Sequence, residues 1–509
     1  MHLEIREVHW IDFKQLYEFY FHKNVQISLA PEVWHRIETT REQFEQVMFK
    51  IQSPVYGVNT GFGSLCNVKI SEDQLADLQR NIVVSHACGT GPYAGDEIVR
   101  YMLYLKIISL AKGYSAVTSA TIRGLMTLLN HNVLPYVPKY GSLGASGDLA
   151  PLAHLSLPLL LAGEVYENTA KKRASECELL KSAGFPIALK SKEGLALLNG
   201  TQYMSAGLTV ALVRAFRIFH LSALISAISL EAFLARREPF DALIHEVRPF
   251  RGQQKVAQFV QSLLNDSEFK YQERSWVQDP YSFRCIPQVL GATLDTLNYA
   301  LNLLLTEVNS VTDNPLFFCN EEVILSGGNF HGQPLAYAAD FAAIAIHELA
   351  NIAERRIFIL LSGQRDLPPF LVMNPGLNSG LMIMQYSAAA LVSASRQLCT
   401  PASVDSIVSS NGQEDHVSMG ANAVNKLLEV VDLVERVIAM ELIAASQALV
   451  FRKGKINQHL EDFLSLFRDG VPPIENDREL SIDLQRAVDF IKTYPISFEH
   501  IQYWISQNE

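Results

Sequence analysis

The 509-residue chain carries 53 acidic and 42 basic side chains, a formal net charge of −11, with 49% hydrophobic and 19% charged residues. This composition is ordinary for a globular protein and gives enough chain for a large core. The excess of negative charge disfavours nucleic acid and anionic membranes as main partners, so we expect neither.

Targeting and cysteine signals are weak. The six cysteines form no Cys-x-x-Cys pair, so they do not suggest a disulfide framework. Charged residues begin at Glu4 with no apolar stretch before them, which is not the pattern of a secretory signal. No uncharged apolar run reaches the length of a membrane span. These observations predict a cytoplasmic protein without a membrane partner.

The first 200 residues are predicted to form a mixed region. Two strands and two helical patterns are predicted there, at residues 25–29, 54–58, 73–84 and 97–129. Dense Gly and Pro predict loops at 132–165, and the polar stretch 164–186 predicts a surface segment with a hairpin.

After residue 200 the sequence changes to long helical patterns. These are predicted at residues 202–237, 288–309, 338–362, 379–399 and 417–451. Many are apolar nearly all round, which indicates burial on more than one side and a bundle extended by partner subunits. A small hairpin is predicted at 316–325, and 457–509 is expected to cover the bundle. We predict a mainly α protein with two domains, residues 1–200 and 201–509.

A run of small residues at 141–151 (Gly-Ser-Leu-Gly-Ala-Ser-Gly-Asp-Leu-Ala-Pro) stands out among the predicted loops. If the amide nitrogen of Gly147 attacked the carbonyl carbon of Ala145, a five-membered ring would form. Loss of water from the ring and from Ser146 would then leave a methylidene electrophile, which the ordinary side chains lack. Gly147 permits the close approach because it has no Cβ. Such a compressed backbone needs a rigid surround.

The triplet alone does not decide for that chemistry. A Gly-Ala-Ser-Gly-Asp run is usually a tight turn that caps the following helix. A phosphate loop is disfavoured because no Lys-Ser or Lys-Thr follows, and a Gly-x-Ser-x-Gly nucleophile elbow because Asp148 replaces the second glycine.

Further motifs carry a family resemblance. Together with residues 141–158, the chain resembles the aromatic amino-acid ammonia-lyases in its segments at 56–63 (Tyr-Gly-Val-Asn-Thr-Gly-Phe-Gly), 85–87 (Ser-His-Ala), 198–201 (Leu-Asn-Gly-Thr), 278–284 (Gln-Asp-Pro-Tyr-Ser-Phe-Arg), 327–332 (Gly-Gly-Asn-Phe-His-Gly) and 413–418 (Gln-Glu-Asp-His-Val-Ser). These segments follow the family's order and span most of the chain.

The resemblance implies a fold, a cofactor and a reaction. The fold would be the fumarase/aspartase-like long-helix bundle with a smaller mixed α/β N-terminal domain, assembled as a homotetramer with shared active sites. In the family, the triplet Ala145, Ser146 and Gly147 becomes 4-methylideneimidazole-5-one (MIO), with no external cofactor. Within the family the chain is most similar to the bacterial histidine ammonia-lyases, so the expected reaction eliminates ammonia from L-histidine to give trans-urocanate.

The resemblance also assigns residues to the chemistry. Tyr56 is expected to be the base that takes the β-proton, with Tyr281 as its partner near the MIO. A free tyrosine has a pKa of about 10, which a neighbouring cation such as Arg284 would lower and burial would raise. The planar guanidinium of Arg284 suits both oxygens of the substrate carboxylate.

Other expected contacts concern the substrate. The family motifs place Gln278, Asn199 and Phe330 in the substrate pocket. A buried imidazole needs a partner on each ring nitrogen, and His86 and Glu414 could each serve one. Glu414 discriminates better, because Ser-His at 85–86 also occurs in tyrosine-using relatives.

No catalytic metal is expected. His347-Glu348 lacks the second histidine of a zinc-protease helix, and the adjacent residues Glu414, Asp415 and His416 are poorly spaced to converge on one ion.

Three alternatives remain open at this point. The first is an MIO-dependent tyrosine ammonia-lyase or aminomutase. The second is a metal-free lyase of the fumarase type, for which the expected Gly-Ser-Ser and Met-Pro-x-Lys motifs are absent from the sequence. The third is an inactive helical scaffold, which the presence of Ser146, Tyr56, Tyr281 and Arg284 disfavours.

Overall fold

The computed structural model describes residues 1–6, 10–51, 53–272 and 276–506. Its contacts divide the chain into two compact units. Unit 1 comprises Met1–Val210, Leu301–Ala339 and Pro401–Asn425, and unit 2 comprises Ala211–Ala300, Asp340–Thr400 and Lys426–Glu509. The units interleave along the chain, whereas the domains were predicted to be continuous, at 1–200 and 201–509. That domain division stays a prediction.

Unit 1 combines short helices with small sheets. Its helices are α1 (Phe13–Phe21), α2 (Pro31–Lys50), α3 (Leu75–His86), α4 (Asp96–Ala111), α5 (Ser119–Asn130), α6 (Leu149–Ser156), α7 (Glu178–Ser182) and α8 (Glu193–Leu198). Its strands are β1 (His2–Ile5), β2 (Gln26–Leu29), β3 (Thr90–Tyr93), β4 (Leu134–Pro135), β5 (Pro138–Tyr140), β6 (Glu164–Glu167), β7 (Ala170–Arg173), β8 (Leu316–Phe318) and β9 (Val323–Leu325). Strands β1 and β2 pair in parallel, and the β3–β5, β4–β6–β7 and β8–β9 pairings are antiparallel.

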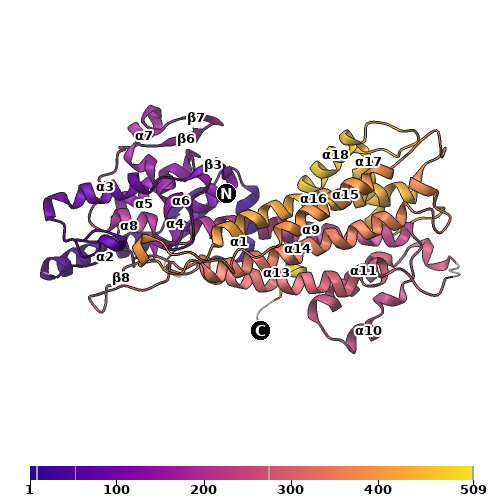
Figure 1. Ribbon diagram of the computed structural model, residues 1–509, viewed down its shortest axis with the longest axis horizontal. Coiled ribbons are helices and arrows are strands. Elements are labelled where there is room, and N and C mark those ends of the chain that lie inside the picture. The colour runs from indigo at the N-terminus through magenta and orange to yellow at the C-terminus, as the bar shows by residue number, and fades with distance from the viewer. Residues whose placement is uncertain (7–9, 52, 273–275, 507–509) are drawn as a thin grey trace. The chain divides into compact units, whose positions relative to one another are not determined.

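Segments far apart in the sequence meet in unit 1. Helix α4 is buried from Ile98 to Ala111, because apolar residues occupy most of these positions. Figure 1 shows the orange segment near residue 410 lying among the indigo and magenta elements of this unit. Residues from three stretches of chain can therefore contribute to one site.

Most predicted elements of this region are confirmed, with three corrections. The stretch 132–165 was predicted as loops but contains β4, β5 and α6. The strand at 25–29 and the hairpins at 164–186 and 316–325 are present. Residues 54–58 form a turn instead of a strand, because the side chain of Asn59 accepts a hydrogen bond from the Val55 N–H at 2.7 Å and closes it. The helical pattern at 97–129 is broken between α4 and α5, where Gly113 has a φ of 89°.

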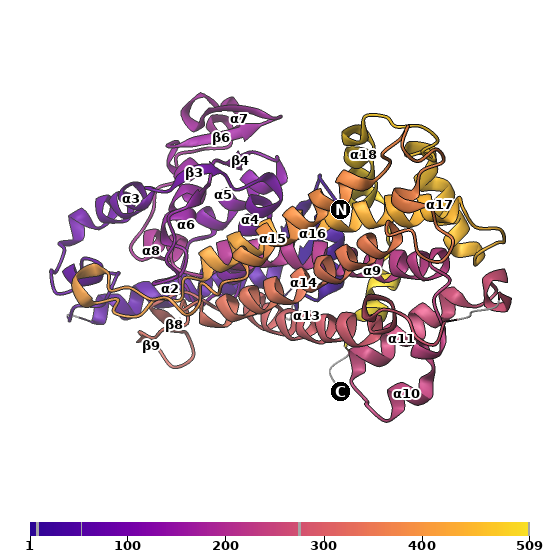
Figure 2. The same ribbon diagram turned by 45° about the vertical axis from the view of Figure 1, so that its right-hand side comes forward.

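Four long helices contribute residues to both units. They are α9 (Gln202–Ala232), α13 (Ile286–Val308), α14 (Gln333–Leu360) and α16 (Gly420–Leu449). Figures 1 and 2 show α13 and α14 side by side in both views, and Thr293 Oγ1 donates to the Ala345 carbonyl across them at 2.9 Å. The helix-rich architecture predicted from the sequence is confirmed.

A buried ion pair joins three of these helices within unit 2. Arg356 on α14 contacts Glu441 on α16 at 2.5 Å, and both side chains are fully buried. Ser229 on α9 donates to the same carboxylate at 2.7 Å. A buried carboxylate with three donors is stable only when all its partners are in place, so the contact fixes how the helices pack.

Shorter helices complete unit 2. They are α10 (Ala242–Glu246), α11 (Arg251–Leu264), α12 (Tyr281–Arg284), α15 (Met382–Leu398), α17 (Gln458–Gly470), α18 (Leu480–Thr493) and α19 (Phe498–Trp504). The last three form the predicted C-terminal layer and bury Phe463, Val488 and Trp504. Among the helices described, α9 alone is long and apolar enough to cross a membrane, and 94% of that stretch is buried, as in a core helix.

Candidate active site

The triplet Ala145, Ser146 and Gly147 lies in a tight loop directly before α6. Gly147 has a φ of 72°, and its backbone pairs with Gly200, whose carbonyl accepts from the Asp148 N–H at 2.8 Å. A Cβ added at Gly147 would lie 2.1 Å from the Gly200 oxygen. Only glycine fits this close approach, which agrees with the glycine that the sequence analysis required at this position.

The loop is held from both sides. The Met419 N–H donates to the Leu143 carbonyl at 2.9 Å, and Ser418 Oγ donates to the Gly144 carbonyl at 3.1 Å. On the other side, the buried Asp148 accepts from Ser142 Oγ at 2.8 Å. Burial raises the pKa of Asp148 to about 7, although its hydrogen bonds act in the opposite direction. The surround is thus rigid on both flanks of the triplet.

A cavity of about 580 Å³ opens over Ser146 in unit 1. Of the residues proposed from the sequence, it is lined by Tyr56, His86, Ser146, Asn199 and Glu414. They come from the loop after α2, the end of α3, the loop before α6, the end of α8 and the segment before α16. The structure therefore brings together side chains that are more than 350 positions apart in the sequence.

Glu414 contacts the triplet directly. Its Oε1 accepts from Ser146 Oγ at 2.8 Å, and its Oε2 accepts from Ser409 Oγ at 2.7 Å. One carboxylate oxygen of Glu414 thus contacts Ser146 at the cavity, and the other contacts Ser409. A carboxylate so placed can accept a ring N–H of a ligand in the cavity.

His86 ends α3 at the cavity wall. Its Nδ1 lies 3.1 Å from Ser85 Oγ, and the side chain is half-buried. Burial lowers the pKa of His86, while the Ile82 carbonyl and the Glu414 charge raise it by less. The imidazole is therefore neutral near pH 7, with one nitrogen as acceptor and one as donor.

Tyr56 presents a phenol whose pKa is raised. Its oxygen accepts from the Gly63 N–H at 3.3 Å. Burial raises the pKa of Tyr56, and the charges of Glu414 and Cys66 add to the effect. The sequence analysis expected a nearby cation, such as Arg284, to lower this pKa. Arg284 belongs to unit 2, so its effect on Tyr56 stays a prediction.

Asn199 is held firmly and keeps one acceptor open. Its Nδ2 donates to the Asn314 carbonyl at 2.7 Å, and its own carbonyl accepts from Lys106 Nζ at 2.6 Å. Its Oδ1 is buried and has no hydrogen-bond partner among the described residues. Asn199 lines the cavity, so this unpartnered acceptor is a candidate partner for a ligand donor such as an amine.

The other predicted residues lie elsewhere. Phe330 is in unit 1, half-buried between β9 and α14, and is not among the residues lining the 580 Å³ cavity. Gln278, Tyr281 and Arg284 belong to unit 2, where Gln278 and Arg284 line a separate cavity of about 330 Å³. The Tyr281 side chain is 71% exposed, and the Arg284 guanidinium lies 4.5 Å from the centre of its ring.

Two residues near the site escaped the sequence analysis. Lys106 is fully buried in α4, and burial lowers its pKa to about 7. A single charge inside an apolar helical run was a usable signal, because lysine is almost never fully buried without a specific partner. Ser409 had no such signal, since a serine in a polar loop is unremarkable.

The described residues hold no group of three or more His, Cys, Asp or Glu side chains that could bind a metal ion. His331 and His416 form a pair whose Nε2 and Nδ1 atoms lie 3.3 Å apart. The absence of a catalytic metal stays a prediction.

The chain is similar to known proteins over most of its length. A family model described as aromatic amino acid lyase matches residues 11–469. The chain is 46% identical over 472 residues to a histidine ammonia-lyase of Caldanaerobacter subterraneus subsp. tengcongensis, with 92% of each chain covered.

Solved structures extend the likeness to the fold. The histidine ammonia-lyase of Trypanosoma cruzi matches with a TM-score of 0.90 and 38% identity, over 100% of this chain and 96% of that one. A tyrosine aminomutase of Streptomyces globisporus matches with a TM-score of 0.91 and 32% identity, over 98% of each chain. On sequence, fold and the residues around Ser146, this chain belongs to the aromatic amino acid lyase family.

Proposed function

We propose that this protein is a histidine ammonia-lyase, which converts L-histidine into trans-urocanate and ammonia with Ala145, Ser146 and Gly147 cyclised to MIO. The observation that carries the proposal is the contact of Glu414 with Ser146, in a cavity that also holds His86. Relatives named histidine ammonia-lyase, such as that of Bacillus subtilis at 44% identity over 93% of this chain, support the substrate.

The residues present fit an MIO group. The positive φ of Gly147 and the 2.1 Å gap between a Cβ there and the Gly200 oxygen support the proposal, because they require a glycine at the position whose amide nitrogen would close the ring. When formed, MIO supplies an electrophile that makes the substrate ammonia a better leaving group. Ring closure and dehydration of Ser146 release two water molecules, so the Ser146 hydroxyl leaves and Glu414 Oε1 becomes available to the substrate.

The remaining steps belong to the chain's own side chains. Glu414 and His86 bind the two ring nitrogens of the substrate imidazole, and a carboxylate stabilises positive charge on that ring. Asn199 Oδ1 accepts a hydrogen bond from the substrate amine. Tyr56 takes the β-proton once a cation lowers its pKa, a role that suits Arg284.

The tyrosine alternative rests on the Streptomyces aminomutase likeness, at 32% identity. A tyrosine phenol has a single polar atom to place against Glu414 and His86, whereas the two ring nitrogens of an imidazole lie apart and can each pair with one of these side chains. This difference in the number of polar ring atoms favours histidine over tyrosine in the proposal.

A parallel turnover assay tests the substrate. Purified protein is given L-histidine or L-tyrosine while the acrylate product is followed by ultraviolet absorbance and ammonia by a separate assay. Urocanate with little coumarate supports the proposal, and coumarate alone overturns it. If neither forms and the Ser146 peptide has its encoded mass, the protein is an inactive scaffold.

The variant Glu414→Gln tests the pocket. Loss of the carboxylate charge removes a charge-assisted hydrogen bond and is expected to lower kcat/KM for histidine by roughly 10- to 100-fold. Glu38→Gln, on the exposed face of α2, controls for the substitution itself. Unchanged histidine kinetics in Glu414→Gln would refute the pocket assignment.

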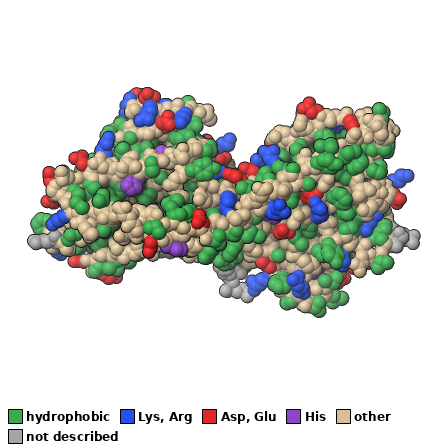
Figure 3. Space-filling view, in the orientation of Figure 1, with side chains coloured by type: hydrophobic (Ala, Val, Ile, Leu, Met, Phe, Trp, Pro, Cys, Tyr) green, Lys and Arg blue, Asp and Glu red, His purple; other side chains and the backbone are tan. Residues whose placement is uncertain are grey.

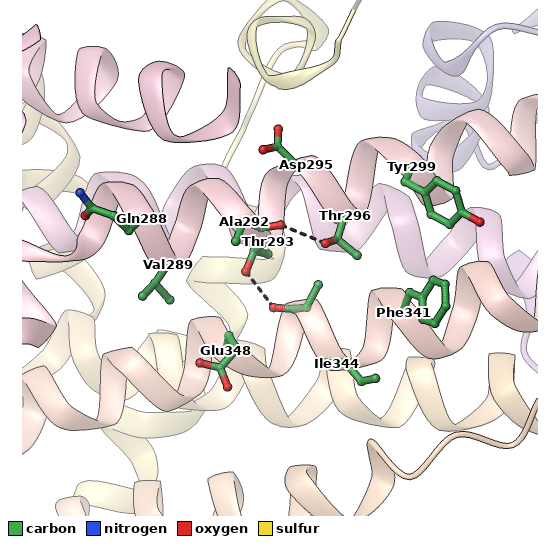
Figure 4. Close-up of a pocket in the computed structure, with 11 residues that line it drawn as sticks. Gln288, Val289, Ala292, Thr293, Asp295, Thr296, Tyr299, Phe341, Ile344 and Glu348 are labelled. Carbon is green, nitrogen blue, oxygen red and sulfur yellow. Dashed lines mark hydrogen bonds between the residues drawn. The ribbon is translucent and has the colours of Figure 1, made fainter. Parts of the chain in front are cut away.

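We further propose a homotetramer with shared active sites in the cytoplasm. A groove of about 870 Å³ between α13 and α14 exposes apolar side chains, including Tyr299, Phe341 and Ile344 (Figure 4). Figure 3 shows hydrophobic side chains on the surface over α13. Exposed apolar patches on long helices are typical of subunit interfaces.

Mixing inactive subunits tests the sharing of sites. Ser146→Ala removes the electrophile from unit 1, and Arg284→Ala removes the carboxylate anchor from unit 2. If active sites combine the two from different subunits, dissociated and reassociated mixtures regain activity that neither variant shows alone. A monomer by light scattering, with no regained activity, would refute the assembly.

A further inference from the structure

The segment that presents Glu414 is an unusual turn. The Ser409 N–H donates to the Glu414 carbonyl at 2.8 Å, which closes the turn. The intervening Ser410, Asn411 and Gly412 have φ values of 48°, 54° and 86°. Non-glycine residues with positive φ are held in place only when their surroundings determine the conformation, so the turn is well defined.

Ser409 also binds the side chain of Glu414. Its Oγ donates to Oε2 at 2.7 Å, while Oε1 accepts from Ser146 Oγ at 2.8 Å. A carboxylate with one oxygen held by the protein has one orientation, and the other oxygen then faces the cavity. Once the Ser146 hydroxyl leaves, the Ser409 contact is the one side-chain hydrogen bond of Glu414 that remains among the described residues.

The same turn contacts the loop of the predicted base. Asn411 Nδ2 donates to Ser64 Oγ at 3.2 Å. Ser64 follows Gly63, whose N–H donates to the Tyr56 oxygen. The turn thus connects the wall that selects the substrate ring with the loop that presents Tyr56.

We propose that Ser409 is a positioning residue that orients the Glu414 carboxylate toward the substrate imidazole and so contributes to substrate choice. This inference rests on the proposed function, because it concerns the imidazole contact of Glu414. Ser409 acts through Glu414 and does not touch the substrate. Removal of its hydroxyl leaves Glu414 free to rotate, and an ordered acceptor is replaced by a disordered one.

A double-mutant cycle tests the proposal. Ser409→Ala is expected to lower kcat/KM for L-histidine roughly tenfold, the value of one charge-assisted hydrogen bond. In a Glu414→Ala background the hydroxyl has no carboxylate to orient, so adding Ser409→Ala should change kcat/KM by less than about twofold. Equal losses in both backgrounds would overturn the proposal, because Ser409 would then act through the turn alone.

Two further variants separate orientation from structure. Ser409→Thr keeps the hydroxyl and is expected to retain the activity that Ser409→Ala loses. Ser406→Ala removes a different hydrogen bond of this segment, in which Ser406 Oγ accepts from the Val417 N–H at 3.0 Å. The loss in kcat/KM caused by Ser406→Ala should be the same whether Glu414 is present or replaced by alanine. A Ser406→Ala effect coupled to Glu414 as strongly as that of Ser409→Ala would also overturn the proposal.

A binding measurement repeats the cycle without turnover. Imidazole-4-propionate, the saturated analogue of the deaminated product, is titrated by calorimetry into each variant. Ser409→Ala should weaken its binding roughly tenfold when Glu414 is present and leave it unchanged when Glu414 is absent. Failure of the proposed function can be told apart from failure of this inference. In the first case the unsubstituted protein turns over tyrosine and not histidine, which is seen before any variant is made.

Discussion

A buried histidine in unit 2 makes a quantitative prediction about stability in acid. His220 on α9 is 4% exposed, and its Nδ1 accepts a hydrogen bond from Trp504 Nε1 at 3.1 Å. The rings of Phe259 and His500 pack beside it. Burial lowers the pKa of His220 to about 3, and the charges of His500, His459 and Arg217 add to this effect.

The sign of the pH effect follows from the lowered pKa. An unfolded histidine takes up its proton near pH 6.5, whereas folded His220 stays neutral down to about pH 3. The contribution of His220 to the free energy of unfolding is therefore fully present above pH 6.5. It is lost as the pH falls towards 3, because the unfolded chain then binds more protons than the folded chain. At pH 5 the free energy of unfolding is lowered by about 2 kcal/mol through His220, and this loss approaches its limit of about 5 kcal/mol near pH 3.

The variant His220→Asn isolates this contribution. Asparagine can still accept a hydrogen bond from Trp504 but does not titrate. Between pH 8 and pH 5 the free energy of unfolding of the variant should therefore fall by about 2 kcal/mol less than that of the wild-type protein. Urea unfolding at both pH values measures the difference, and His35→Asn, which removes an exposed imidazole, serves as the control. If the wild-type protein and His220→Asn lose the same free energy between the two pH values, the reasoning is refuted.

Two further predictions concern unit 1. Gly147→Ala places a Cβ 2.1 Å from the Gly200 oxygen, so we expect no loss of two waters from the Ser146 peptide by mass spectrometry and no turnover. Gly470→Ala, where a Cβ meets nothing within 4 Å, is the control, and a dehydrated Gly147→Ala peptide would contradict the prediction. Asp313→Asn breaks the buried pair with Lys192, whose Nζ lies 2.6 Å away, and is expected to cost about 3–5 kcal/mol of unfolding free energy. The double variant Lys192→Met/Asp313→Leu should cost less, and a loss under about 1 kcal/mol in Asp313→Asn would contradict the reasoning.

Motifs with a specific chemistry predicted much of the site. Ser146, His86 and Glu414 were proposed from the sequence, and the structure places them around one cavity. The apolar patterns gave the long helices to within about five residues, because long runs with few Gly or Pro and a broad apolar stripe leave a clear signal. Phe330 could not be placed in this way, since a motif names a residue without fixing where its side chain lies.

What the sequence could not show were relations between distant segments. The contact of Ser409 with Glu414 depends on the left-handed turn between them. A serine and an asparagine in a loop do not by themselves predict that conformation. The raised pKa of Tyr56 reflects burial, which is a property of the folded unit and not of the motif. Turn chemistry at Asn59 likewise overrode the strand predicted at 54–58.

The interleaving of unit 1 has a consequence for the timing of maturation during synthesis. Leu143 and Gly144 are held by Met419 and Ser418, which the ribosome adds more than 270 residues later. A nascent chain that has passed residue 147 but not residue 419 lacks these two hydrogen bonds, so this flank of the triplet loop is not yet held. If the triplet rearranges as proposed, a chain that ends before residue 418 has to do so without this support, and the dehydrated peptide is expected only in chains that reach this segment.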